Sequence, residues 1–215
     1  MGAKTWMLVY AEGSAREALK NRPVLDADAT LELATELFAP AQLERLGDGN
    51  LAFTCPRGRD ICVGCFPGVS VVAAKEFGGD YPSRLPQRFL AAAAGRTVWL
   101  HAMHSVVDWF AYAKWVNGKL VRSLSVSPDT GVREDFGARM SFEEPYWAGL
   151  HPVHSDPDDD EDYPLPFHPL DMAEAALAEL FGYQLEGDAS ADLVDPESIP
   201  LVRYRRSRPW WQLWR

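Results

Sequence analysis

Two adjacent carboxylates, Glu143 and Glu144, are followed closely by two aromatic residues, Tyr146 and Trp147. Paired carboxylates beside aromatic rings can form a pocket that performs general acid–base chemistry or binds a ligand. The same residues also fit a loop at the rim of the fold, in which the two aromatic side chains cover the end of the core. We favour the rim loop, because aromatic side chains bury large areas, and the pocket remains the alternative.

Histidines occur twice as pairs three residues apart, His101 with His104 and His151 with His154. Two histidines and a carboxylate such as Asp156 would suit a metal hydrolase, in which the bound metal activates water. The first pair lies in strand-like sequence, where residues three apart point to opposite faces. The second pair is less constrained, but solvated loop histidines are the commoner explanation. We therefore predict no metal at either pair.

The three cysteines, Cys55, Cys62 and Cys65, suggest a zinc or redox site. A redox pair needs its first cysteine at a helix N-terminus, and a zinc site built from cysteines needs a fourth ligand. Cys62 and Cys65 instead fall in a predicted strand, on opposite faces. We predict free, buried thiols, no zinc and no cofactor, and the odd cysteine count suits a reducing cytosol.

An acidic loop spans residues 155–163, and its aspartates have the alternating spacing of a calcium-binding loop. Glu161 stands where that loop needs glycine, and Phe167 stands where it needs glutamate. We therefore predict a solvated run of charge. The chain also lacks glycine-rich phosphate-binding loops and the Gly-x-Ser-x-Gly elbow of hydrolases, which weakens the case for an enzyme.

The last thirteen residues, 203–215, combine five arginines with Trp210, Trp211 and Trp214 and contain no acid. Three tryptophans so close together are too apolar to lie comfortably in water. We predict that they fold back onto the chain's own surface, with binding to a partner as the main alternative. Peripheral membrane contact is the least favoured, because the chain has a net charge of −10.

Length and charge limit the possible functions. The chain has 215 residues and no apolar stretch long enough to span a membrane. Residues 1–154 are nearly neutral, whereas residues 155–202 carry 14 acidic and no basic side chains. This excess of negative charge disfavours nucleic acid as a partner. We expect a single domain over residues 1–202 followed by the basic tail, and a cytoplasmic location, since no signal-peptide pattern is present.

Local patterns predict the elements that must position these residues. Strands are expected over residues 4–11, 61–66, 69–74, 97–103, 106–116, 120–126 and 132–136. Helices are expected from Ser14 to about Asn21, from Asp26 or Asp28 to Pro40, from Pro82 to Gly95 and from Pro169 to Gly182. Turns are expected at Gly47–Asn50 and Pro56–Arg59, and Asn117-Gly118 predicts a type I′ hairpin.

The order of these elements predicts the fold class. Strands occur in runs with helices near both ends, and they do not alternate as βαβ units. The sequence therefore predicts an α+β fold, a mostly antiparallel sheet with about four helices packed on it.

Four segments, Met1–Tyr10, Cys65–Val69, Trp109–Leu124 and Phe142–Trp147, together resemble an uncharacterised actinobacterial family, a domain of unknown function. The resemblance covers nearly the whole chain and implies no activity and no site. The predicted hairpin with its following Phe-Glu-Glu-Pro loop also resembles bacterial immunity-type α+β domains, at the level of the fold alone.

These observations favour a non-catalytic binding or interaction module with a protein partner, of the immunity or conflict-system type. Tyr146, Trp147 and the three tail tryptophans are its expected binding residues. The alternative is an enzyme with an unrecognised pocket that uses Glu143 and Glu144, or a site at His151 and His154.

Overall fold

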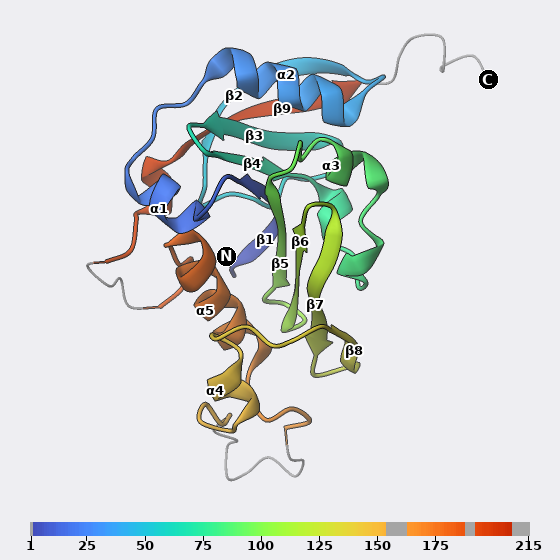
Figure 1. The fold of residues 1–215 in the computed structure, drawn as a ribbon, viewed down its shortest axis with the longest axis vertical. Coiled ribbons are helices and arrows are strands. Elements are labelled where there is room, and N and C mark those ends of the chain that lie inside the picture. The colour runs from blue at the N-terminus through green and yellow to red at the C-terminus, as the bar shows by residue number, and fades with distance from the viewer. Residues whose placement is uncertain (1, 154–162, 188–191, 208–215) are drawn as a thin grey trace, which may run out of the picture.

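The computed structural model describes residues 2–153, 163–187 and 192–207. These residues form one nine-stranded sheet in the order β2-β9-β3-β4-β1-β5-β6-β7-β8 (Figure 1). Every pair of neighbouring strands is antiparallel, which confirms the predicted α+β class with a mostly antiparallel sheet. The strands are β1 (Lys4–Ala11), β2 (Gln42–Asn50), β3 (Asp60–Phe66), β4 (Val69–Ala73), β5 (Thr97–His104), β6 (Trp109–Val116), β7 (Lys119–Ser127), β8 (Gly131–Phe136) and β9 (Pro200–Ser207).

The described residues contain five α-helices, where about four were predicted, and three short 3₁₀ helices. The helices are α1 (Ala15–Lys20), α2 (Ala27–Phe38), α3 (Gln87–Ala91), α4 (Glu144–Trp147), α5 (Pro169–Phe181), η1 (Lys75–Phe77), η2 (Pro82–Arg84) and η3 (Pro196–Ser198). The predicted caps Ser14 and Asp26 accept N–H groups in the first turns of α1 and α2. No helix in the described ranges is both long and apolar enough to cross a bilayer.

Helices cover both faces of the sheet (Figure 1). One face of the sheet, here called the α5 face, is covered by α1 and α5, and the core on this side contains Ala173 and Leu177. The other face, here called the α2 face, is covered by α2 and α3, and the core on this side contains Leu37 and Phe89. Because side chains alternate along a strand, a sheet covered on both sides buries consecutive residues. This explains the continuous apolar run of β4, which is buried at every position.

The hairpin of β6 and β7 confirms the predicted turn at Asn117-Gly118. These residues have φ angles of +50° and +73°, the positive values that a type I′ turn requires. Side chains along β6 alternate between the two faces, since Trp109 lies on the α2 face and Phe110 on the α5 face.

Two strands are not predicted by the sequence patterns. β2 runs through Gly47–Asn50, where a turn was expected, and its ladder shifts register between Arg45 and Gly47. A bulge of this kind places glycine at a φ of +134° and lets an edge strand continue past it. The turn prediction was wrong because isolated glycines indicate turns and bulges alike.

β9 is the second unpredicted strand, and it lies between β2 and β3. The boundary predicted between residues 202 and 203 therefore falls inside a strand, and residues 203–207 belong to the sheet rather than to a tail. The arginines of β9 pair with acids outside the acidic segment: Arg205 pairs with Asp60 at 2.8 Å, and Arg206 pairs with Glu76. Residues 208–215, with the three tail tryptophans, lie outside the described residues.

The helix predicted from Pro82 to Gly95 is instead divided into η2 and α3. Pro86 separates them, because proline lacks the N–H that a continuous helix would need at that position. The apolar residues of this segment, such as Leu85 and Phe89, lie in the core of the α2 face. The segment that begins at Glu143, predicted to be irregular, contains the single helical turn α4.

Candidate functional site

Glu143 is fully buried and forms an ion pair with the fully buried Arg122 of β7. Arg122 Nε donates to Glu143 Oε1 at 2.9 Å, and Nη2 donates to Oε2 at 2.5 Å. The carboxylate also accepts the Met140 N–H at 2.7 Å and the hydroxyl of Tyr112. Both oxygens of the Glu143 carboxylate therefore accept hydrogen bonds. These bonds connect the loop after β8 to the sheet.

The same network continues on the other side of Arg122, whose Nη1 donates to the carboxylate of Asp135. Burial, and next the neighbouring Glu143 carboxylate, raise the pKa of Tyr112, so its phenol stays protonated and can donate. Glu144, by contrast, is exposed. The two glutamates proposed from the sequence as a carboxylate pair therefore do not converge on one pocket.

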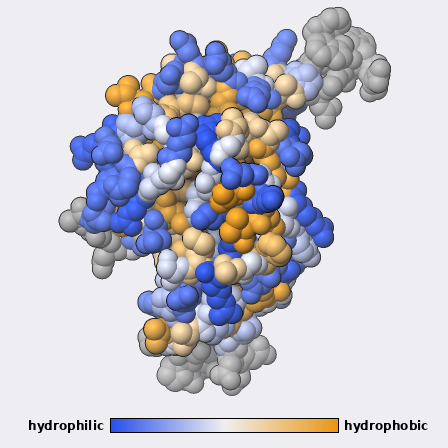
Figure 2. Space-filling model, in the orientation of Figure 1, coloured by the Kyte–Doolittle hydropathy of each residue, from blue (hydrophilic) through white to orange (hydrophobic). Residues whose placement is uncertain are grey.

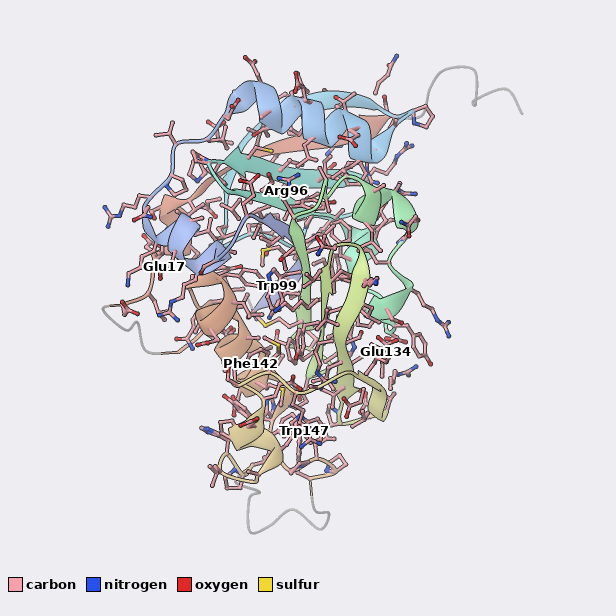
Figure 3. All side chains as sticks on the ribbon, in the orientation of Figure 1. Glu17, Arg96, Trp99, Glu134, Phe142 and Trp147 are labelled. Atoms are coloured by element: carbon pink, nitrogen blue, oxygen red, sulfur yellow. The ribbon has the colours of Figure 1, made fainter. Side chains whose placement is uncertain are left out.

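Tyr146 and Trp147 pack into the end of the core. The Tyr146 ring stacks on His151 with 4.4 Å between ring centres, and its hydroxyl donates to a backbone carbonyl of α5 at 3.0 Å. Trp147 meets Phe167 edge-on, at 4.9 Å between ring centres. Figure 3 shows Phe142 and Trp147 in the lower part of the view, near α4. Neither Tyr146 nor Trp147 lines the two cavities described below.

His101 and His104 lie on opposite faces of β5, as predicted. His101 is fully buried, with Nδ1 2.7 Å from the Thr5 hydroxyl and Nε2 3.1 Å from the Ala173 carbonyl. Burial lowers the pKa of His101 to about 4, so this imidazole is neutral and structural. His104 instead lines both cavities. His154 and the acidic loop up to residue 162 lie outside the described residues.

Cys62 and Cys65 of β3 are buried in the cores of opposite faces, as the strand position predicted. Cys55 is half-buried in the loop after β2. Among the described residues, no three side chains of His, Cys, Asp or Glu gather as a metal site. That the purified protein holds no zinc stays a prediction.

A cleft of about 940 Å³, here called the β1 cleft, lies at the N-terminal end of β1. Its lining residues come from five segments, within residues 2–6, 52–57, 104–106, 184–187 and 193–197. Small-molecule sites in proteins have volumes of roughly 300–1,000 Å³. The β1 cleft is therefore large enough to enclose a small organic ligand.

Backbone hydrogen bonds fix the walls of the β1 cleft. The Trp6 N–H donates to the Thr54 carbonyl at 2.8 Å, which holds the loop after β2 beside the start of β1. On the opposite side, Glu174 of α5 accepts the N–H groups of Leu185 at 2.8 Å and Glu186 at 3.2 Å. Burial raises the pKa of Glu174 to about 7.

The β1 cleft contains apolar side chains that remain in contact with water. Phe53 is 47% exposed and Val106 is 73% exposed, and both line the cleft. On the face shown in Figure 2, by contrast, hydrophilic residues lie between the apolar patches. An exposed aromatic ring inside a concave and otherwise ordered cleft is typical of a ligand-binding site.

Two cations, Lys4 and Arg57, also line the β1 cleft. Neither forms an ion pair within the described residues. Among the acids of the cleft, Glu186 accepts the Ala3 N–H at 2.9 Å and Asp195 accepts an N–H of η3 at 2.9 Å. These two acids are thus engaged with the backbone, whereas the two cations remain available.

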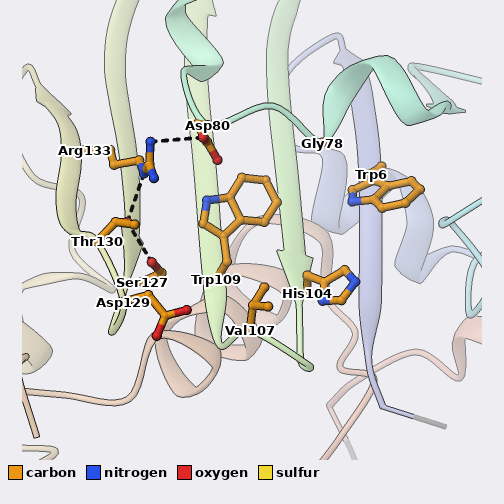
Figure 4. Close-up of a pocket in the computed structure, with 10 residues that line it drawn as sticks. All are labelled: Trp6, Gly78, Asp80, His104, Val107, Trp109, Ser127, Asp129, Thr130 and Arg133. Atoms are coloured by element: carbon orange, nitrogen blue, oxygen red, sulfur yellow. Dashed lines mark hydrogen bonds and ion pairs between the residues drawn. The ribbon is translucent and has the colours of Figure 1, made fainter.

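A second cavity, of about 300 Å³, adjoins the first (Figure 4). Trp6 and His104 line both cavities. In the ladder, Trp6 lies opposite Ala102, and Ala102 lies opposite Ala111. The small side chains of this row leave room above the sheet, next to the Trp109 ring.

Most polar groups of the second cavity are bonded to one another, as the dashed lines in Figure 4 indicate. Arg133 pairs with Asp80 at 3.1 Å and donates to the Thr130 hydroxyl at 2.9 Å. The Thr130 hydroxyl lies 2.8 Å from that of Ser127. Because these groups satisfy one another, the β1 cleft, with its available cations, is the better candidate site.

Sequence reasoning missed the residues that distinguish the β1 cleft, namely Lys4, Phe53 and Arg57. Lys4 reads as the first residue of a strand, and Arg57 reads as part of a turn. The one local signal is Phe53, a large apolar residue between two segments predicted as turns.

Comparison with known proteins identifies a family for this chain. Residues 5–204 match the sequence profile of DUF6928, a family of unknown function. The match spans nearly the whole chain and confirms the predicted membership of such a family, whereas the actinobacterial origin stays a prediction. Neither the curated proteins nor the solved structures give a match.

Proposed function

This chain belongs to the DUF6928 family, whose description assigns no activity, and we propose that it is a binding module whose β1 cleft encloses a small organic molecule with an apolar body. The observation that carries the proposal is the coincidence of a 940 Å³ cleft with the exposed ring of Phe53. Cytoplasmic location and a non-catalytic role, both expected from the sequence, belong to the same proposal.

The energetics of the cleft favour occupation. Fully burying a phenylalanine side chain contributes about 1.5–3 kcal/mol. Phe53 is already about half-buried, with 47% of its surface exposed, so covering the remainder contributes about 1 kcal/mol. Val106 on the adjacent turn, which is 73% exposed, adds a comparable amount. A ligand body lying against both side chains would gain this free energy without any large rearrangement of the walls.

The chemistry of Cys55 argues for binding rather than catalysis in the cleft. A nucleophilic cysteine needs a lowered pKa. Burial instead raises the pKa of the Cys55 thiol, although the nearby Lys4 and Arg57 oppose this effect. The thiol is therefore protonated near neutral pH and acts as part of the lining.

Cys55 also supplies a test, because it is the most accessible of the three thiols, Cys62 and Cys65 being buried. We would measure the rate at which iodoacetamide alkylates Cys55, by mass spectrometry, with and without 2-naphthylmethanol, a neutral probe with an apolar body. The proposal expects saturating probe to slow alkylation of Cys55.

A matched pair of variants locates the probe. Phe53→Ser should weaken the binding of 2-naphthylmethanol about fivefold, the equivalent of about 1 kcal/mol of lost apolar contact. Phe136→Ser is the control, because Phe136 is similarly exposed, at 52%, and lies outside the cleft. Unchanged alkylation at saturating probe, or equal losses in the two variants, would contradict the proposal.

A further inference from the structure

The two cations of the β1 cleft lie close to each other in the fold, although 53 positions separate them in sequence. Lys4 begins β1, and the hydrogen bond from Trp6 N–H to the Thr54 carbonyl places the segment before Arg57 beside it. A parallel bridge between Thr5 and Thr54 supports the same placement. Lys4 and Arg57 both lie near Cys55, because the charges of both lower the pKa of its thiol.

The groups between these cations carry no compensating charge near neutral pH. Cys55 is a neutral thiol, since burial raises its pKa. His104 lies opposite Lys4 in the β1–β5 ladder. Burial and then the Lys4 ammonium lower the pKa of His104, so the imidazole is also neutral. Neither group therefore offsets the charges of Lys4 and Arg57.

The acids of the cleft come from residues 184–187 and 193–197. Glu186 and Asp195 accept backbone N–H groups at 2.9 Å, and Glu197 is exposed on the short helix η3. The cleft thus combines two cations that form no ion pair within the described residues, two acids that accept backbone N–H groups, and the apolar side chains of Phe53 and Val106. A ligand that matches this arrangement is an anion with an apolar body.

We propose that Lys4 and Arg57 bind the anionic group of the ligand, a carboxylate or a phosphate, while its apolar body lies against Phe53 and Val106. This inference rests on the proposed function of the β1 cleft. The arginine guanidinium can bind either anion through two parallel N–H donors, and the lysine ammonium adds a point charge.

Four probes with the same ring system test the inference: 2-naphthoate, 2-naphthyl phosphate, neutral 2-naphthylmethanol and cationic 2-naphthylmethylammonium. Protection of Cys55 from iodoacetamide gives a dissociation constant for each. We expect the better anion to bind about tenfold more tightly than the alcohol, and the ammonium to bind more weakly than the alcohol. The carboxylate and phosphate arms show which anion the site prefers.

Charge-removing variants assign the effect to the two side chains. Lys4→Gln and Arg57→Gln should each weaken anion binding about fivefold and leave the affinity for the alcohol unchanged. Arg59→Gln is the matched control, because it removes one positive charge two residues from Arg57, at an exposed position that does not line the cleft.

The outcomes separate this inference from the proposed function. Equal affinity for alcohol and anions, or an Arg59→Gln effect as large as that of Arg57→Gln, would overturn the anion site and leave the apolar cleft intact. If no probe protects Cys55, both proposals fall together. Selective loss of anion binding in Lys4→Gln and Arg57→Gln, with the alcohol unaffected, would support both.

Discussion

Arg122 and Arg57 differ in burial and in the partners of their guanidinium groups. Arg122 is fully buried, and its guanidinium donates to two carboxylates and to backbone carbonyls. Arg57 is exposed at the edge of a cleft and has no ion-pair partner within the described residues. A charged side chain that is paired within the fold stabilises the fold. A charged side chain that has no partner in the fold is available to bind a ligand. Of the two carboxylates noticed first in the sequence, Glu143 belongs to the first kind, whereas Glu144 is exposed.

The sharpest way to break this comparison is to remove the carboxylate that Arg122 requires. Glu143→Gln leaves part of a buried guanidinium charge uncompensated, and breaking such pairs costs about 3–5 kcal/mol. We expect a fall in the free energy of unfolding of that size in urea titrations, with Tm lower by roughly 10 °C. The exposed neighbour provides the control, since Glu144→Gln should change stability by less than about 0.5 kcal/mol. Similar effects of the two substitutions would show that Glu143 is not structural.

A smaller loss of stability is expected at Gly78, which packs against the Trp6 ring that lines both cavities. A Cβ atom at Gly78 would come within 2.6 Å of Trp6 Nε1, whereas one at Gly79 would meet no atom within 4 Å. Gly78→Ala should therefore displace the Trp6 ring and destabilise the protein by about 1–3 kcal/mol. Gly79→Ala should be neutral or slightly stabilising. Thermal unfolding and tryptophan fluorescence of the two variants compare them directly, and indistinguishable results would contradict the close packing at Trp6.

Glu174 joins the core to the cleft and predicts a dependence on pH. Its pKa is raised by burial to about 7 in the folded protein, against about 4.3 for an unfolded glutamate. The folded state therefore holds this proton more tightly, so its contribution to stability is present below about pH 4 and is lost as pH rises to about 7.

Glu174→Gln should accordingly gain stability relative to wild type between those pH values, by up to about 4 kcal/mol, and the difference should level off above pH 7. Urea titrations across this range measure it. A stability difference between the two proteins that does not change with pH would show that Glu174 titrates normally.

The smallest change in stability is expected when the charges of Lys4 and Arg57 are removed. Lys4→Gln and Arg57→Gln should each change the free energy of unfolding by less than about 0.5 kcal/mol, because exposed charges without partners contribute little to stability. Equilibrium unfolding in urea checks this. A loss of 2 kcal/mol or more in either variant would approach that of Glu143→Gln. It would show that the cleft cations stabilise the fold as Arg122 does.

The elements that the sequence predicts well depend on local patterns. The caps Ser14 and Asp26, the hairpin at Asn117-Gly118 and the helix end at Gly182 each follow from the conformation of one or two residues. Burial on alternating faces likewise follows from the spacing of apolar residues along β6.

The elements that the sequence does not predict depend on distant partners. Arg205 and Arg206 read as a basic tail, yet they lie in a strand because β2 and β3, far away in sequence, pair with its backbone. The β1 cleft was missed for the same reason. Lys4, Phe53 and Val106 have no shared motif, and only the folded sheet brings their segments together.

The position of β9 has a consequence for how the chain acquires its structure during synthesis. β9 is the only sheet neighbour of β2 among the described strands, and it separates β2 from β3. Residues 42–50 must therefore wait for residues 200–207, which a ribosome adding about 5–20 residues per second delivers roughly 8–30 seconds later. Throughout that interval β3 presents an unpaired edge, the kind of surface on which chains aggregate. Truncation within residues 200–207 would make that transient exposure permanent.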